Sequence, residues 1–157
     1  MEGPYKGTGN DNAWGQRHAD LLNRIMGADM AAIETEYDRA AQLEYPGGET
    51  GHGWAAADGF WMGLRAALPD AKFTIHHQIG RDDPNMPPRS AIRWSLHGMH
   101  SGWGAFGRPT GAEVYVLGIS QAEWGELISG QIKLRREWTL FDETSVWKQI
   151  LLQTGAV

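Results

Sequence analysis

The sequence predicts an α+β domain in which three N-terminal helices pack on one face of a curved antiparallel sheet, with a short helix at the C-terminus. Two observations predict this class. Apolar residues recur at steps of three and four before Pro69, which is the period of helices, and they alternate after Pro69, which is the period of strands. Helices that precede a run of strands are typical of α+β folds. A chain of 157 residues fits one such domain, which we expect over residues 13–157.

The helical half follows a polar arm. Residues 1–12 have no hydrophobic period, and we expect them to form a flexible arm. Helices are expected at 13–27, from about 29 to 37, and at 58–69, with an extended piece at 40–45 between the second and the third. Gly27 is a typical C-cap, Asp58 a typical N-cap, and Pro69 ends the third helix.

The second half predicts a sheet with one apolar face. Strands are expected at 73–79, 92–100, 113–123 and 131–141, and a closing helix at 142–152. Each pair of strands is taken as symmetric about its loop. This register brings three groups of side chains together on the apolar face: His77 with Trp94, Leu96 with Ile119 and Arg136, and His100 with Tyr115 and then Asp142.

His100 is the main candidate for proton chemistry. An imidazole can take or give a proton near neutral pH, and the register sets this one beside a phenol and a carboxylate. We predict His100 as general base or acid and Tyr115 as hydrogen-bond donor, with Asp142 or Asp38 orienting His100. A purely structural histidine is the alternative for His100, and a cap of the final helix is the alternative for Asp142.

Five further residues are predicted to bind substrate: Arg136, His77, Trp61, Trp94 and Trp138. The two basic residues would bind a phenolate, carboxylate or oxyanion, and the indoles would stack on an aromatic ring. Each has a structural alternative. The histidine would be a core residue bonded to backbone, the arginine would form an ion pair with Glu34, Asp38 or Glu137, and the indoles would pack in the core.

Composition and charge argue against several classes. The net charge of −5 and the lack of a basic run argue against nucleic acid as a partner. Without cysteine there is no disulfide, thiolate nucleophile or Cys-based metal site. His97 and His100 point to opposite faces of a strand, so we predict no metal site, and no cofactor motif is present. The polar start and short apolar runs indicate a cytoplasmic protein without a membrane segment.

Short strings follow one another in a fixed order along the chain: Tyr37-Asp38, Pro46-Gly47-Gly48, 68–73, Arg93-Trp94, 98–102, 107–111, Glu137-Trp138, Asp142 and 147–150. Over residues 14–152 they resemble the SnoaL-like polyketide cyclases of the nuclear-transport-factor-2-like superfamily. The resemblance implies a cone in which the sheet wraps three helices and leaves a deep apolar pocket, usually in a homodimer or larger homo-oligomer. It implies chemistry without metal or cofactor.

The family's histidine in its GTH-type string corresponds to His100. Such cyclases also carry a carboxylate on the strand after the Thr110-Gly111 turn, and residues 114–120 contain none. Similar proteins include lyases that release formaldehyde from lignin-derived aromatic compounds.

Together these observations predict a cofactor-independent acid–base enzyme that acts on a small aromatic or polyketide-like molecule by aldol or retro-aldol chemistry. The alternative is a non-catalytic module that binds a small hydrophobic ligand or dimerises through its sheet. Two or more titratable groups around one ligand position would favour the enzyme.

Overall fold

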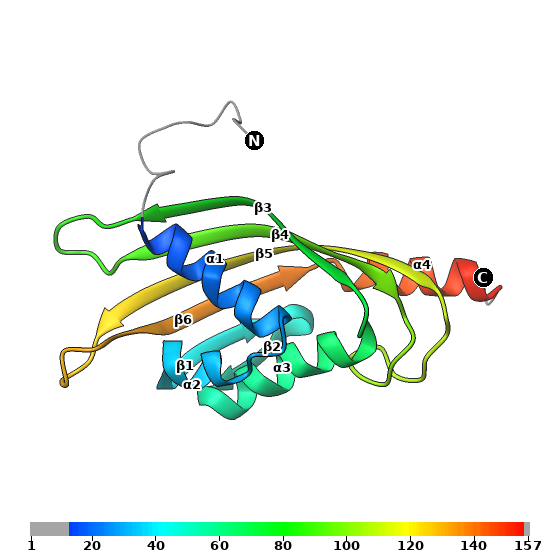
Figure 1. Ribbon diagram of the computed structural model, residues 1–157, viewed down its shortest axis with the longest axis horizontal. Coiled ribbons are helices and arrows are strands. Elements are labelled where there is room, and N and C mark those ends of the chain that lie inside the picture. The colour runs from blue at the N-terminus through cyan, green and yellow to red at the C-terminus, as the bar shows by residue number, and fades with distance from the viewer. Residues whose placement is uncertain (1–12, 156–157) are drawn as a thin grey trace.

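The computed structural model describes residues 13–155 and shows an open, curved six-stranded sheet with four helices (Figure 1). The helices are α1 (Ala13–Met26), α2 (Ala31–Glu36), α3 (Gly53–Ala67) and α4 (Glu143–Thr154). α1 packs on β3 and β4 at one edge of the sheet, and α3 packs on β1 and β2 at the other edge. α4 extends beyond the end of β6. The predicted α+β class is confirmed. The arm expected at residues 1–12 lies outside the described residues.

The strands follow the order β2-β1-β6-β5-β4-β3. Their bounds are β1 (Tyr37–Tyr45), β2 (Glu49–His52), β3 (Lys72–Arg81), β4 (Arg89–Met99), β5 (Glu113–Glu126) and β6 (Ile132–Phe141), and a short 3-10 turn, η1 (Pro46–Gly48), joins the first two. The four long strands β3 to β6 are antiparallel as predicted. β1 runs parallel to β6, so the predicted all-antiparallel sheet is mixed at this point. Four strands and α3 separate β1 from β6 along the chain, which leaves room for the crossover that a parallel pair requires.

The helices differ from the prediction at two boundaries. α2 ends at Glu36, and Tyr37 opens β1 with its side chain buried, so the apolar spacing that predicted a longer helix belongs to a strand. α3 begins at Gly53, five residues before the predicted cap at Asp58. Gly53 has φ +76°, and a Cβ there would lie 2.6 Å from the carbonyl oxygen of Arg39. No helix among the described residues is long and apolar enough to cross a membrane.

The pairing of β4 with β5 was predicted wrongly, and the error reverses the faces of β5. Tyr115 lies opposite His97, three residues from the predicted His100. The loop after β4 is not a symmetric hairpin, because the backbone N–H groups of Thr110 and Gly111 both donate to the carbonyl of His100. An odd displacement turns every side chain over. Tyr115 therefore faces outward with 44% of its surface exposed.

A register shift between β5 and β6 reverses part of β6 as well. Leu134 is buried as predicted, but the pairing slips by one residue before Arg136. Beyond the shift Glu137 and Thr139 point inward, while Arg136 is exposed and Trp138 lies half-buried on the outer face. The prediction that Arg136 and Trp138 share the inner face with Leu134 was wrong, since strict alternation cannot anticipate a bulge.

α4 completes the sheet where β6 ends. β5 pairs with β6 only from Gly118 onward, so its first residues would present an open edge. Gln149 accepts from the N–H of Tyr115 and donates to its carbonyl, over 2.8 and 2.9 Å. Gln153 does the same at Glu113, over 2.8 and 2.6 Å. The two amides take the place of a neighbouring strand and fix α4 beside β5.

Candidate active site

A fully buried carboxylate lies between the sheet and α3. Glu137 accepts two hydrogen bonds of 2.6 Å, from Tyr45 Oη to Oε1 and from Tyr37 Oη to Oε2. Trp61 Nε1 donates to Tyr37 Oη over 3.3 Å. Distances of 2.6 Å are typical of hydroxyl donors on an ionised acceptor. Within residues 13–155 no cation forms an ion pair with Glu137, so hydroxyl and indole dipoles alone stabilise its charge.

Burial controls the protonation of this cluster. It raises the pKa of Glu137 from 4.5 to about 7, although the hydrogen bonds it accepts act in the opposite direction. Burial and the charge of Glu137 raise the pKa of Tyr37 and of Tyr45 well above the ordinary phenol value. The phenols therefore remain protonated, whereas the carboxyl can take or release a proton near neutral pH.

A pocket of about 440 Å³, which we call the α3 pocket, lies between α3, the β1–β2 connection, the loop before β5 and the end of β6. This volume suits a small organic molecule. Three aromatic rings line it: those of Tyr45, Phe60 and Phe141. The rings of Tyr45 and Phe60 stack with centroids 3.9 Å apart and planes 7° apart. Glu49 and Glu143 supply its charged lining.

The sequence of α3 keeps the pocket open. Ala55, Gly59 and Gly63 line it at intervals of four residues, so they share one helix face. A Cβ added at Gly59 would meet no atom within 4 Å. Tyr45 lines this space, and its hydroxyl donates to Glu137. One phenol therefore joins the pocket to the buried carboxyl.

His100 does not line the α3 pocket. The residue directly follows β4, its side chain is fully buried, and its Nδ1 is hydrogen-bonded to Thr110 Oγ1 over 2.9 Å. Its Nε2 has no hydrogen-bond partner among residues 13–155. The ring lies edge-on to Phe106, with centroids 6.1 Å apart, and Phe106 packs edge-on against Phe141 at 6.2 Å. One aromatic side chain thus lies between His100 and the pocket wall.

The predicted partners of His100 lie elsewhere. Tyr115 is on the outer face, where its ring is 6.1 Å from that of His97. Asp142 caps α4 by accepting from the N–H of Ser145, which was its structural alternative. Asp38 accepts a hydrogen bond from the backbone N–H of Ala40, and its second carboxylate oxygen lies 3.4 Å from Arg135 Nε. Thr110, which was not predicted as a site residue, is hydrogen-bonded to the imidazole instead.

The predicted substrate-binding residues are also dispersed. Arg136 is exposed, and its ion-pair partner, at 3.9 Å, is Glu123 rather than any predicted acid. His77 lies opposite Arg93 and not beside Trp94, because β3 has an irregularity after Ile75. Trp138 lies on the outer face. The remaining two indoles, Trp61 and Trp94, are fully buried with centroids 6.0 Å apart, and they pack in the core.

Sequence reasoning missed Glu137 and Tyr45 as site residues. Glu137 was considered as a possible ion-pair partner of Arg136 and as part of the string Glu137-Trp138, and not as a site residue. A glutamate is usually solvated, so its sequence neighbours give no sign that this one is buried. The available signal was the even spacing of Tyr37 and Tyr45, which places two phenols on one face of an apolar strand. Buried phenols require hydrogen-bond partners.

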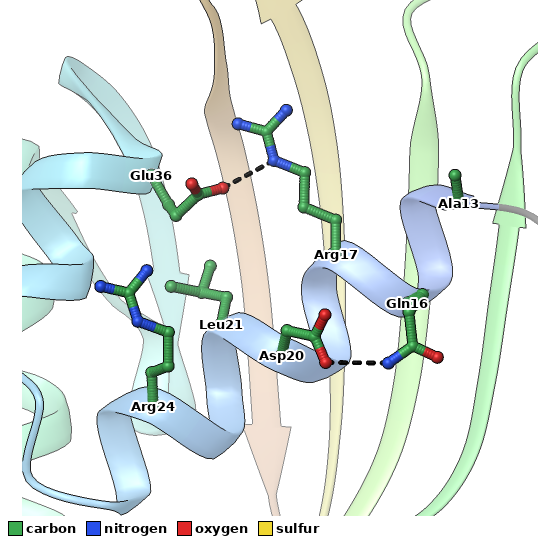
Figure 2. Close-up of a pocket in the computed structure, with 7 residues that line it drawn as sticks. All are labelled: Ala13, Gln16, Arg17, Asp20, Leu21, Arg24 and Glu36. Carbon is green, nitrogen blue, oxygen red and sulfur yellow. Dashed lines mark hydrogen bonds and ion pairs between the residues drawn. The ribbon is translucent and has the colours of Figure 1, made fainter.

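A second depression, of about 370 Å³, lies along the outer side of α1 (Figure 2). Its charged groups already have partners: Arg17 pairs with Glu36 at 2.6 Å, and Asp20 accepts a hydrogen bond from Gln16 over 2.8 Å (Figure 2). Arg24 pairs with Asp29 at 2.8 Å. It offers no buried titratable group comparable to Glu137. In the part of the chain that the structure describes, no three acidic or histidine side chains are grouped to hold a metal ion.

The curved sheet, the helices packed on it and the pocket beside α3 define the class of nuclear-transport-factor-2-like α+β proteins. The chain belongs to the SnoaL-like domain family, whose model matches residues 16–133. The resemblance noted in the sequence is thereby confirmed.

Solved structures with the same fold carry several activities in their descriptions. IdmH from Streptomyces antibioticus, a proposed polyketide cyclase, has 18% identity and a TM-score of 0.68 over 88% of this chain and 99% of its own. AclR from Streptomyces galilaeus, a proposed hydroxylase, has 17% identity and a TM-score of 0.63 over 92% and 84%. A ketosteroid isomerase-like protein from Erwinia carotovora atroseptica has 14% identity and a TM-score of 0.55 over 80% and 91%. At these identities the likeness shows the fold. No curated protein matches the chain in sequence.

We predict that Glu137 makes stability depend on pH. Because folding raises the pKa of this carboxyl to about 7, its contribution is fully present below about pH 4.5 and is lost as the pH rises to about 7. The loss is about 3 kcal/mol at 1.36 kcal/mol per pKa unit. Urea unfolding of wild type and Glu137→Gln between these pH values measures it, and the difference between the two proteins should fall with rising pH.

The comparison with Glu137→Gln removes the effect of other groups. Burial lowers the pKa of His18 to about 3, which makes both proteins less stable as the pH falls from about 6.5. The prediction would be contradicted if the difference in unfolding free energy between wild type and Glu137→Gln stayed constant with pH.

Proposed function

We propose that this protein is a cytoplasmic acid–base enzyme that acts, without a cofactor, on a small aromatic or polyketide-like molecule held in the α3 pocket. Membership of the SnoaL-like family and likeness to a proposed polyketide cyclase support this class of chemistry. The observation that carries the proposal is the state of His100. It is a fully buried imidazole whose Nε2 lacks a partner within residues 13–155, one aromatic ring away from the pocket.

In the proposed retro-aldol direction, His100 Nε2 takes the proton of a substrate hydroxyl. The bond between the carbinol carbon and the neighbouring α-carbon breaks as the carbinol becomes a carbonyl. The electron pair enters an enolate, and the imidazolium returns its proton to the α-carbon. An aldol closure follows the same steps in reverse. Phe106 must turn aside for the substrate to reach His100, and Thr110 orients the ring.

Polyketide cyclisation with a strand carboxylate is the less supported variant. The inward side chains at the start of β5 include Val114 and Val116, which are fully buried and apolar, so β5 offers no acid beside His100. Cleavage or isomerisation assisted by groups outside β5 fits the residues better, and a formaldehyde-releasing lyase is one such enzyme.

Replacing His100 tests the proton-transfer role. We expect His100→Ala to lower kcat/KM by about 10²–10⁴-fold, the usual contribution of a general acid or base, with the melting temperature nearly unchanged. His97→Ala is the matched control, because His97 lies three residues before His100 but faces outward and pairs with Glu113. The assay incubates each protein with phenolic, β-hydroxyketone and polyketide-like compounds and follows ring closure and released formaldehyde.

Equal activity of the two histidine variants would contradict the role of His100. Loss of folding in His100→Ala alone would assign the residue to structure, and His100→Gln would then be compared at a temperature where it is folded.

Filling the α3 pocket tests where the substrate binds. Gly59→Leu places a side chain into space that a Cβ enters without contact, and leucine favours a helix by up to about 1 kcal/mol over glycine. The variant should therefore keep or raise the melting temperature while it loses turnover and ligand binding. Undiminished turnover in a folded Gly59→Leu protein would place the substrate elsewhere.

The second candidate is a non-catalytic ligand-binding module. One observation favours it: three indoles, those of Trp61, Trp94 and Trp124, are fully buried and fill the interior, so the remaining pocket lies toward the edge and not beside His100. Saturable binding to wild type that Gly59→Leu abolishes, without turnover of any compound in the panel, would favour this module over the enzyme.

We also propose that the protein is a homodimer that pairs through the outer face of the sheet. Apolar side chains gather there: Leu117, Ile119 and Leu140 are each more than half exposed, and Ile119 lies directly opposite Leu140 on the neighbouring strand. Contiguous exposed apolar surface is typical of interfaces. A two-fold pairing would cover the same patch on both copies.

A charge on this face should separate the copies. We expect light scattering during size exclusion to report a dimer for wild type and a monomer for Leu140→Glu. Ile128→Glu, in the exposed turn between β5 and β6, serves as the control and should remain dimeric. A monomeric wild type, or a dimeric Leu140→Glu, would contradict the proposed interface.

A further inference from the structure

Two chemically equal phenols of β1 differ in one respect that bears on function. Tyr37 and Tyr45 each donate to a carboxylate oxygen of Glu137 over 2.6 Å, and both are buried. Only Tyr45 borders the α3 pocket.

We propose that Tyr45 is a catalytic residue whose hydroxyl donates to a carbonyl oxygen of the substrate, with Glu137 as the proton store behind it. The inference rests on the proposed function and assigns a substrate class: an apolar aromatic molecule that carries a ketone or aldehyde oxygen. The aromatic side chains that line the pocket, Tyr45, Phe60 and Phe141, would pack against the aromatic part.

The hydrogen-bond inventory explains how the pair would work. While Glu137 is ionised, the protons of Tyr45 and Tyr37 both point to the carboxylate, and neither is free for a ligand. Once Glu137 is protonated, it can donate to Tyr45 Oη, and the Tyr45 proton becomes free to point into the pocket. As an enolate forms, the Tyr45 proton passes to the enolate oxygen and the Glu137 proton passes to Tyr45. Glu137 loses one proton, the enol gains one, and Tyr45 stays neutral.

The surroundings of Glu137 fit this exchange. The groups that bear on it are Tyr37 and Tyr45 from β1, Trp61 from α3 and Thr139 from β6, and Ala122 of β5 lies opposite it in the sheet. None of these is a cation that would hold the carboxyl permanently ionised. Its pKa, raised to about 7 by burial, lets both protonation states be populated near neutrality. The raised pKa of Tyr45 disfavours a free phenolate, which the coupled transfer avoids.

The test uses methyl naphthyl ketone, an aromatic ligand whose only hydrogen-bonding group is an acceptor and which does not titrate. Its dissociation constant is measured by calorimetry for wild type, Tyr45→Phe, Tyr37→Phe and Glu137→Gln, at several values between about pH 5.5 and pH 8.5. We expect affinity of the wild type to fall about tenfold as the pH rises through about 7, the value of one lost hydrogen bond. Tyr45→Phe should bind about tenfold more weakly at low pH, without pH dependence.

Tyr37→Phe is the matched control, because it removes an equivalent bond to Glu137 without touching the pocket. It should retain wild-type affinity at low pH and the pH dependence, and Glu137→Gln should lose the pH dependence. The proposal would be overturned if Tyr45→Phe bound the ketone as tightly as wild type. It would also be overturned if Tyr45→Phe and Tyr37→Phe lost the same amount of affinity. Wild type that fails to bind the ketone at all would overturn the α3 pocket as well. Because His100 takes no part in this binding, a failure of the proposed proton transfer at His100 would remain distinguishable.

Discussion

The one-residue register shift between β5 and β6 turns the carboxylate of Glu137 into the interior, and the arrangement of the site depends on it. With strict alternation from Leu134, Arg136 and Trp138 would face the helices and Glu137 would face solvent. The shift instead places a charge in an aromatic core. Such a charge must be neutralised or supplied with donors. β1 supplies them, since its parallel pairing with β6 brings two phenols to the two carboxylate oxygens.

Stability and function are in tension at this cluster. A carboxyl whose pKa is raised by burial destabilises the folded protein at neutral pH, and a hydrophobic residue of similar volume would remove that cost. The same raised pKa allows proton exchange near neutrality beside a pocket that small residues of α3 keep open. His100 presents a parallel case. Its buried Nε2 has no partner among residues 13–155, which destabilises the folded protein unless a ligand or water bonds to this nitrogen.

The sequence predicted the fold well and the site poorly, for one physical reason. Helical and strand periods depend on local residues, so the α+β class and most element positions followed from apolar spacing. Side-chain neighbours depend on register, which is set by loop geometry and bulges. The fold-back of Thr110 and Gly111 onto His100 moved Tyr115 to the outer face. His100 was placed correctly inside because it ends a regular strand, whereas Glu137 lies just beyond an irregularity that its own sequence does not reveal.

The most direct measurement is the proton affinity of the buried carboxyl. Carbon-13 NMR of the side-chain carboxyl carbon of Glu137, assigned by its disappearance in Glu137→Gln, follows ionisation as a function of pH in the folded protein. A midpoint near pH 7 is predicted, because burial outweighs the hydrogen bonds from Tyr37 and Tyr45. A midpoint near 4.5, the value of an exposed glutamate, would contradict a dry interior at this position and with it the account of the site.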